Sequence, residues 1–272
     1  MGIINVTQDS FSGDGTTVDK AIAQGLQMAK QGADILDIGG ESTRPGASKV
    51  DVDQELAQVI PVIKALVDKI DIPISIDTSK PEVMAASLGA GAAIINDVSA
   101  LRGLEKSKKA EESLKILANS DCPIILMHMQ GEPATMQNAP SYSDVMLQVY
   151  SFLEQRIEFC LANGIAKERI IVDPGIGFGK TPEHNRTLMT QQRILRGLGV
   201  PVLLGLSRKS IVGHLSGVSR PEQRDNSSNL LAALGYLAGA DIFRVHDVRG
   251  ACEALLVAKG WFKGMESTQK HG

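Results

Sequence analysis

The chain has 272 residues, 43% of them hydrophobic and 22% charged, with a formal net charge of −3. This balance is typical of a globular protein with a large core, and it argues against nucleic acid or an anionic membrane as a partner. Because no apolar run approaches the ~20 residues of a membrane span and no signal-like segment opens the chain, we expect a cytoplasmic protein.

Short apolar runs alternate with helical patterns along the chain. The runs predict strands at residues 2–5, 35–38, 74–76, 92–95, 123–127, 170–172, 202–204 and 242–245. Helices are predicted after them, at residues 18–31, 53–69, 81–89, 105–115, 145–163, 185–198, 229–238 and 249–263. Pro61 is expected to kink its helix or to move its boundary, and the polar tail after residue 263 is expected to be disordered.

This alternation predicts an α/β fold with a parallel sheet. Eight strand–helix units favour closure into a (β/α)8 TIM barrel over an open, doubly wound sheet. Since no linker or change in composition divides the chain, we expect residues 1–272 to form a single domain.

A polar residue stands at or near the carboxyl end of each predicted strand. In chain order these residues are Asn5, Asp37, Asp77, Asn96, His128, Asp173, Lys209, and Arg244 with His246. Any one of them could cap the helix that follows. Because the carboxyl ends of barrel strands converge on one mouth, the whole series predicts a shared site.

The side chains of this series, with two from the second loop, fall into two chemical groups. Donors suited to phosphate oxygens come from Thr43, Arg44, Arg244 and His246. Hydrogen-bonding groups suited to a flat ligand with several N–H groups come from Asp77, Asn96 and Asp173, and Lys209 adds a positive charge. Asn5 could be a weak ligand for a Mg²⁺ ion held mostly by substrate phosphate and water.

Two further motifs were weighed. The GIGFGKT stretch at residues 175–181 is not a nucleotide-binding loop, because Pro174 stands where the first glycine of that motif must be. His128 is either catalytic or a hydrogen-bonded histidine at the barrel rim, and the sequence leaves both open.

Eight stretches together resemble the dihydropteroate synthase family of pterin-binding TIM barrels. They read MGIINVTQDSFS, DIGGESTRPG, IDTSKPEV, IINDVSA, LMHMQGEPATMQ, DPGIGFGKT, GLSRKS and FRVHDV, in the family's order from Met1 to Val248. The resemblance implies a transferase of folate biosynthesis that joins 6-hydroxymethyl-7,8-dihydropterin diphosphate to p-aminobenzoate. It also implies Mg²⁺ as cofactor, 7,8-dihydropteroate and pyrophosphate as products, inhibition by sulfonamides, and a homodimer.

The resemblance also implies roles for single residues. Catalytic roles go to Arg244, His246 and Lys209, and contacts with the pterin diphosphate to these three and to Thr43, Asp77, Asn96, Asp173 and Phe178. The p-aminobenzoate side receives Arg44, Ser207 and Arg208, and Asn5 is the expected metal ligand. Asp37 is expected to support the floor of the pterin site, although its place beside Gly39 also suits a structural role.

The chain departs from the family pattern at several places, among them SGDG at residues 12–15, where SDGG is commoner. Gln8 stands where proline is usual, and RDNSSN at residues 224–229 replaces a stretch of small residues. Two rival functions were considered: a pterin-binding methyltransferase domain and a catalytically silent barrel that serves as a partner protein. The first should not need an anion site at Arg244 and His246, and the second would be expected to lose several strand-end residues.

Overall fold

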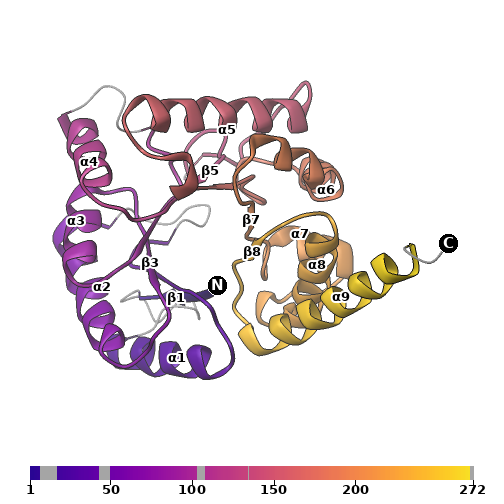
Figure 1. Ribbon diagram of the computed structural model, residues 1–272, viewed down its shortest axis with the longest axis horizontal. Coiled ribbons are helices and arrows are strands. Elements are labelled where there is room, and N and C mark those ends of the chain that lie inside the picture. The colour runs from indigo at the N-terminus through magenta and orange to yellow at the C-terminus, as the bar shows by residue number, and fades with distance from the viewer. Residues whose placement is uncertain (7–16, 43–49, 103–107, 134, 270–272) are drawn as a thin grey trace.

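The computed structural model describes residues 1–6, 17–42, 50–102, 108–133 and 135–269, and shows a ring of helices around central parallel strands (Figure 1). The strands are β1 (Gly2–Asn5), β2 (Leu36–Gly39), β3 (Ile74–Asp77), β4 (Ile94–Asp97), β5 (Ile124–Met127), β6 (Ile170–Asp173), β7 (Leu203–Leu204) and β8 (Ile242–Phe243). Among these residues, no helix is long and apolar enough to cross a membrane.

The strands close into a barrel. β1 to β6 pair in sequence order as a parallel sheet, and β7 pairs in parallel with β8. The two sheets meet at both edges, where the Val172 N–H donates to the Pro201 carbonyl at 3.0 Å and the Ile3 N–H donates to the Val245 carbonyl at 3.0 Å. This closure confirms the predicted (β/α)8 barrel.

Helices cover the outside of the barrel. They are α1 (Val18–Lys30), α2 (Val52–Val67), α3 (Pro81–Gly89), α4 (Lys108–Ala118), α5 (Val145–Ala162), α6 (Pro182–Thr190), α7 (Ser210–Ser216), α8 (Asp225–Leu237) and α9 (Val248–Gln269). In Figure 1, α1 to α4 line one side, α5 and α6 lie at the top, and α8 and α9 pack together at the lower right.

At five places the helices differ from the predictions. The helix predicted at residues 185–198 begins at Pro182, after a Thr181–His184 capping box, and gives way at Gln192 to a 3-10 helix. α7 was not predicted, and α8 begins at Asp225 instead of residue 229. α2 continues through Pro61, and α9 extends to Gln269 where a disordered tail was expected.

Side chains of each strand alternate between two apolar regions, as the period of a strand requires. Ile95, Ile124 and Val172 face outward and pack in the main core between strands and helices. Their neighbours Ile94, Ile125 and Ile171 face inward and form the floor of the barrel. The floor is completed by Met1, Leu203, Ile35 and Ile242. This floor closes the barrel below the strand ends that carry the polar residues.

Candidate functional site

A layer of mostly polar side chains lies directly above the apolar floor. Successive inward positions on a strand are two residues apart. Two residues beyond floor residues Ile35, Ile94, Ile171 and Ile242 stand Asp37, Asn96, Asp173 and Arg244. The same step leads from Leu203 to Gly205, which places no side chain in the layer. The barrel geometry thus brings together residues that the sequence only suggested were neighbours.

Arg244 links two carboxylates at the centre of this layer. Its Nε donates to Asp37 Oδ2 at 2.5 Å, and its Nη2 donates to Asp77 Oδ2 at 2.8 Å. Asn96 also donates to Asp37 Oδ2, at 3.2 Å. Asp37 is fully buried, so its charge depends on these partners. Asp37 therefore anchors Arg244 and Asn96, whatever contact it makes with a ligand.

The charges of the layer influence one another. Burial, with the charge of Asp37 adding to it, raises the pKa of Asp77 to about 7 in spite of Arg244. Burial works to lower the pKa of Arg244, but Asp37 and Asp77 outweigh it and hold that pKa above its ordinary value. Arg244 therefore stays cationic while Asp77 can change charge near neutral pH.

A second cluster joins Asp173, Lys209 and Phe178. Lys209 Nζ donates to the Ile176 carbonyl at 2.6 Å and lies 4.5 Å from the centre of the Phe178 ring. Burial lowers the pKa of Lys209 to about 8, although the Asp173 carboxylate opposes this. A methyl group on Gly205 would lie 3.6 Å from Asp173 Oδ2 and 3.8 Å from Lys209 Nζ. Gly205 thus lies directly beside both groups and places no side chain between them.

The loop after β6 is held by a buried lysine that the sequence analysis missed. Lys180 Nζ donates to the carbonyls of Gly175 and Phe178 and contacts Nδ1 of His128, each at 2.9 Å. The same Nζ also lies 3.4 Å from the His128 carbonyl oxygen. Burial, with Lys209 and Arg102 adding to it, lowers the pKa of Lys180 well below its ordinary value, although the Asp173 carboxylate opposes this. The loop can turn this tightly because Gly175 has a φ of +67°, and a methyl group there would lie 1.9 Å from the His128 carbonyl oxygen.

His128 is a hydrogen-bonded histidine, since its ring Nδ1 lies 2.9 Å from Lys180 Nζ. Burial, with Lys180 and Arg102 adding to it, lowers its pKa to about 2, so the ring is neutral. The ring of Tyr142 contacts those of His128 and His184, with ring centres 6.0 Å and 4.9 Å away. The GIGFGKT stretch therefore forms a loop that is turned by its glycines and held by the buried Lys180. It is not a nucleotide-binding loop.

Ser207 and His246 form a pair next to Arg244. The Ser207 hydroxyl lies 2.9 Å from His246 Nδ1 and accepts the backbone N–H of His246 at 3.2 Å. Because Ser207 is buried, it fixes the orientation of the imidazole. Arg208, the next residue, directs its guanidinium to Asp225 on α8 in two bonds of 2.7 Å.

The remaining expected site residues have different outcomes. Asn5 is half-buried at the end of β1, where its register partner is Gly39. Thr43 and Arg44 lie outside the described residues. The parts of the chain that the structure describes contain no group of three or more His, Cys, Asp or Glu side chains arranged to hold a metal ion.

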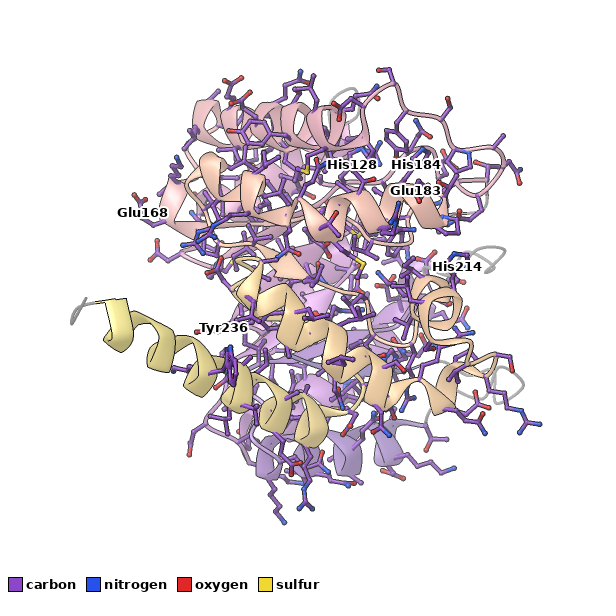
Figure 2. The ribbon with its side chains drawn as sticks, turned by 90° about the vertical axis from the view of Figure 1, so that its right-hand side faces the viewer. His128, Glu168, Glu183, His184, His214 and Tyr236 are labelled. Atoms are coloured by element: carbon purple, nitrogen blue, oxygen red, sulfur yellow. The ribbon has the colours of Figure 1, made fainter. Side chains whose placement is uncertain are left out.

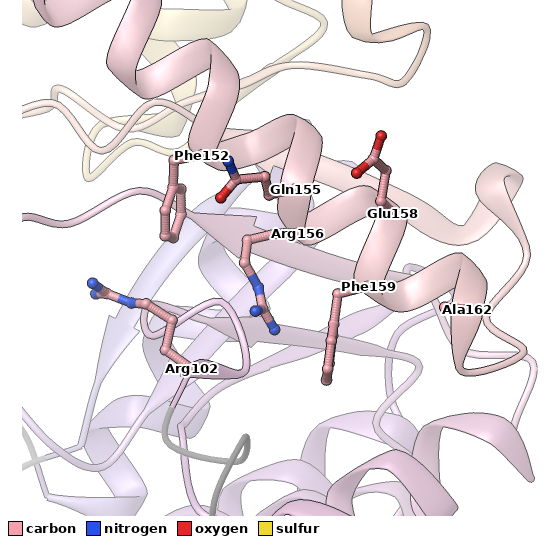
Figure 3. Close-up of a pocket in the computed structure, with 7 residues that line it drawn as sticks. All are labelled: Arg102, Phe152, Gln155, Arg156, Glu158, Phe159 and Ala162. Carbon is pink, nitrogen blue, oxygen red and sulfur yellow. The ribbon is translucent and has the colours of Figure 1, made fainter.

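A separate cavity of about 510 Å³ lies against α5 (Figure 3). Arg102 lies 5.3 Å from the Phe152 ring centre, and Arg156 lies 4.2 Å from that of Phe159. None of the strand-end residues lines this cavity. It is distinct from the barrel mouth.

The fold and the mouth define a class: a (β/α)8 barrel that carries carboxylates, an amide, a guanidinium and an imidazole at the carboxyl ends of its strands, which is where barrel enzymes build their sites. Comparison with known proteins agrees with this class. The family model described as "pterin binding enzyme" matches residues 1–246.

The chain is similar to dihydropteroate synthases over almost its whole length. It is 43% identical over 269 residues to that of Escherichia coli K12, covering 98% of this chain and 93% of the relative. A Yersinia pestis dihydropteroate synthase in complex with a sulfonamide drug superposes with a TM-score of 0.89 at 42% identity, covering 97% and 94% of the two chains. A Xanthomonas albilineans dihydropteroate synthase with 4-aminobenzoic acid gives 0.87 at 48% identity, covering 96% and 91%. The chain therefore belongs to the pterin-binding enzymes and, within them, to the dihydropteroate synthases.

Proposed function

We propose that this protein joins 6-hydroxymethyl-7,8-dihydropterin diphosphate to p-aminobenzoate, releasing 7,8-dihydropteroate and pyrophosphate. The observation that carries the proposal is the polar layer above the barrel floor, which holds Asp77, Asn96 and Asp173, with the Lys209 amine close to Asp173. Buried carboxylates and an amide suit the N–H groups of a pterin edge, and an analogue that cannot pair with them is rejected strongly.

The reaction breaks the bond between the pterin methylene carbon and the diphosphate oxygen. The amine of p-aminobenzoate forms the new C–N bond and loses a proton to water. In this proposal, the guanidinium of Arg244 and an imidazole N–H of His246 stabilise the leaving diphosphate, and the barrel holds both side chains in place. Ser207 contributes by orienting the imidazole, as its contact with Nδ1 indicates.

We assign the remaining expected contacts as part of the same proposal. Lys209 and Phe178, which already lie against each other, border the pterin ring. Contact with p-aminobenzoate is assigned to Ser207 and Arg44, and contact with the diphosphate to Thr43. Arg208, beside Ser207, directs its guanidinium to Asp225 instead. Asp37 supports the pterin floor through Arg244 and Asn96.

Mg²⁺ is proposed as the cofactor. The donor set fits an ion held mostly by substrate, because Asn5 offers a neutral oxygen and Mg²⁺ commonly keeps several waters and substrate phosphates as ligands. When bound, the ion would neutralise charge on the leaving diphosphate. Removal of Mg²⁺ by EDTA is expected to abolish turnover and to leave the folded structure intact, as judged by circular dichroism.

The protein is also proposed to be a single domain over residues 1–272, to act in the cytoplasm and to form a homodimer. The dimer is supported by exposed apolar side chains on neighbouring helices: Leu230, Leu234 and Leu237 on α8, and Leu256, Val257 and Trp261 on α9. Exposed apolar patches of this kind commonly mark protein–protein contacts.

One assay tests the activity directly. The protein is incubated with the pterin diphosphate, p-aminobenzoate and Mg²⁺, and both pyrophosphate and dihydropteroate are measured. Equal amounts of the two products are expected. Pyrophosphate without dihydropteroate, or neither product, would refute the proposal. Methyl transfer from a folate to a corrinoid would instead support the methyltransferase alternative.

A further inference from the structure

The segment that carries Lys209 is fastened to the start of α8. Arg208 forms two hydrogen bonds of 2.7 Å with the Asp225 carboxylate, and its backbone N–H donates to Ser228 Oγ at 3.0 Å. Arg224 Nη1 donates to the carbonyls of Arg208 at 2.9 Å and Lys209 at 3.3 Å. We call Arg224, Asp225 and Ser228 the α8 clamp. It fixes both the side chain and the backbone of Arg208.

The fastened backbone has an uncommon conformation. Arg208 has a φ of +60°, in the left-handed region that residues other than glycine rarely adopt. Such a conformation persists only where surrounding contacts enforce it. The clamp supplies these contacts, because it engages the N–H, the carbonyl and the guanidinium of this one residue.

The turn at Arg208 determines where Lys209 points. Lys209 follows the turn directly and is the N-cap residue of α7. From there its side chain reaches the loop after β6, where Nζ donates to the Ile176 carbonyl at 2.6 Å. A relaxed turn would redirect this side chain away from Asp173 and Phe178.

The backbone of α7 lies close to the Arg224 guanidinium of the α8 clamp. A methyl group on Gly213 would lie 2.6 Å from Cζ and Nη2 of Arg224, so the guanidinium packs directly against the backbone of α7. Arg224 Nε also donates to the Val218 carbonyl at 2.9 Å, just after that helix. Arg224 therefore binds both ends of the segment from Arg208 to Val218.

We propose that the α8 clamp positions Lys209 for the pterin substrate, and that Arg208 acts through Lys209 and not by direct contact with p-aminobenzoate. This inference rests on the proposed function, since it names what holds one of the proposed pterin contacts. It also assigns a positioning role to residues 224–229, where the sequence departs from the family pattern.

A double-mutant cycle separates this role from a general loss of stability. Binding of the pterin diphosphate with Mg²⁺ is measured by calorimetry on the full chain for the native protein, Asp225→Asn, Lys209→Met and the double variant. Asp225→Asn alone is expected to weaken binding about tenfold, as small displacements near a site commonly do. In the Lys209→Met background it should change binding by about twofold or less, because the side chain it positions is already absent.

The matched control is Glu183→Gln on α6. Glu183 also makes two hydrogen bonds with an arginine, Arg186, at 3.1 and 2.6 Å, but on an exposed surface (Figure 2). This variant should bind like the native protein. Asp225→Glu, which keeps the charge, should recover most of the affinity. An equal effect of Asp225→Asn in both backgrounds, or no effect in either, would overturn the proposal.

A second measurement does not depend on the activity. Burial lowers the pKa of the Lys209 amine to about 8. In Asp225→Asn, NMR titration of labelled lysine should show it rising toward the ordinary value of about 10.4. If Asp225→Asn does not fold, Ser228→Ala replaces it, since it removes only the hydroxyl that accepts the Arg208 N–H. An unchanged Lys209 pKa would refute the clamp, whereas a native protein that forms no pyrophosphate would refute only the proposed function.

Discussion

Arg244 balances the charge at the centre of the mouth. We predict that Arg244→Ala slows turnover by about a hundredfold, the usual cost of losing one donor to a developing anion. It should also lower the free energy of unfolding by about 3–5 kcal/mol, because buried carboxylates lose their cationic partner. Steady-state turnover and urea unfolding measure the two effects.

Two further variants separate these effects. Adding Asp37→Asn to Arg244→Ala should recover part of the stability and none of the turnover, since it removes one of the unpaired charges. Arg249→Ala, which breaks an exposed pair with Glu253 at 3.2 Å, should change neither quantity. Native turnover in Arg244→Ala would contradict its assignment to the leaving group.

Asp77 should make pterin binding depend on pH. Its pKa is raised from 3.8 to about 7, so the carboxylate that can accept N–H groups forms as the pH rises through that value. Below it, affinity for the pterin diphosphate should fall by up to about tenfold per pH unit, as linkage to one proton requires. Asp77→Asn should bind more weakly at neutral pH and lose this dependence on pH. An unchanged slope in the variant would exclude Asp77 as its source.

The same shift has a consequence for stability. A carboxyl whose pKa is higher in the folded than in the unfolded state favours folding at low pH, and this contribution is lost as the pH rises through the folded pKa. For Asp77 the loss begins above the ordinary pKa of 3.8 and is complete as the pH passes about 7. In thermal unfolding, Asp77→Asn should therefore lose less stability than the native protein as the pH rises from 3.8 to about 7.

At the scale of the element, the loop after β6 depends on Lys180. Lys180→Met leaves buried carbonyls of Gly175 and Phe178 without a donor, and each such group costs about 1–3 kcal/mol. Because Asp173 and Phe178 flank this loop, pterin affinity should fall together with stability. Lys20→Met, on the exposed side of α1, is the control for loss of a lysine. Calorimetric binding at native strength in Lys180→Met would show that the loop keeps its shape without the ammonium group.

At the scale of the whole molecule, α8 and α9 carry the proposed dimer contact. Leu256 is 68% exposed, as is common for a side chain that a second copy covers. We predict that Leu256→Glu gives a monomer in analytical ultracentrifugation. Leu147→Glu on α5, where the native leucine is 62% exposed, should leave the native mass unchanged. A native protein that sediments as a monomer would exclude the dimer.

The sequence by itself determined the barrel and the members of its polar layer. Alternating apolar runs and helical patterns specify strand and helix locally, and eight such units close only in a few ways. Asp37, Asn96, Asp173 and Arg244 were identifiable because they end apolar runs, where a strand's period of two places them above the floor. Short helices such as α7 were not predicted, because seven residues show too little periodicity to indicate a helix.

Only the tertiary structure determined which side chains bind each other. Arg244 meets Asp37 and Asp77 across 207 and 167 residues of chain, and no local pattern encodes such a pairing. The neutral state of the His128 ring depends in part on Lys180, and the direction in which the Lys209 side chain points depends on α8. These partners become neighbours when the barrel closes, and charge and hydrogen bonding in a buried site depend on neighbours in space.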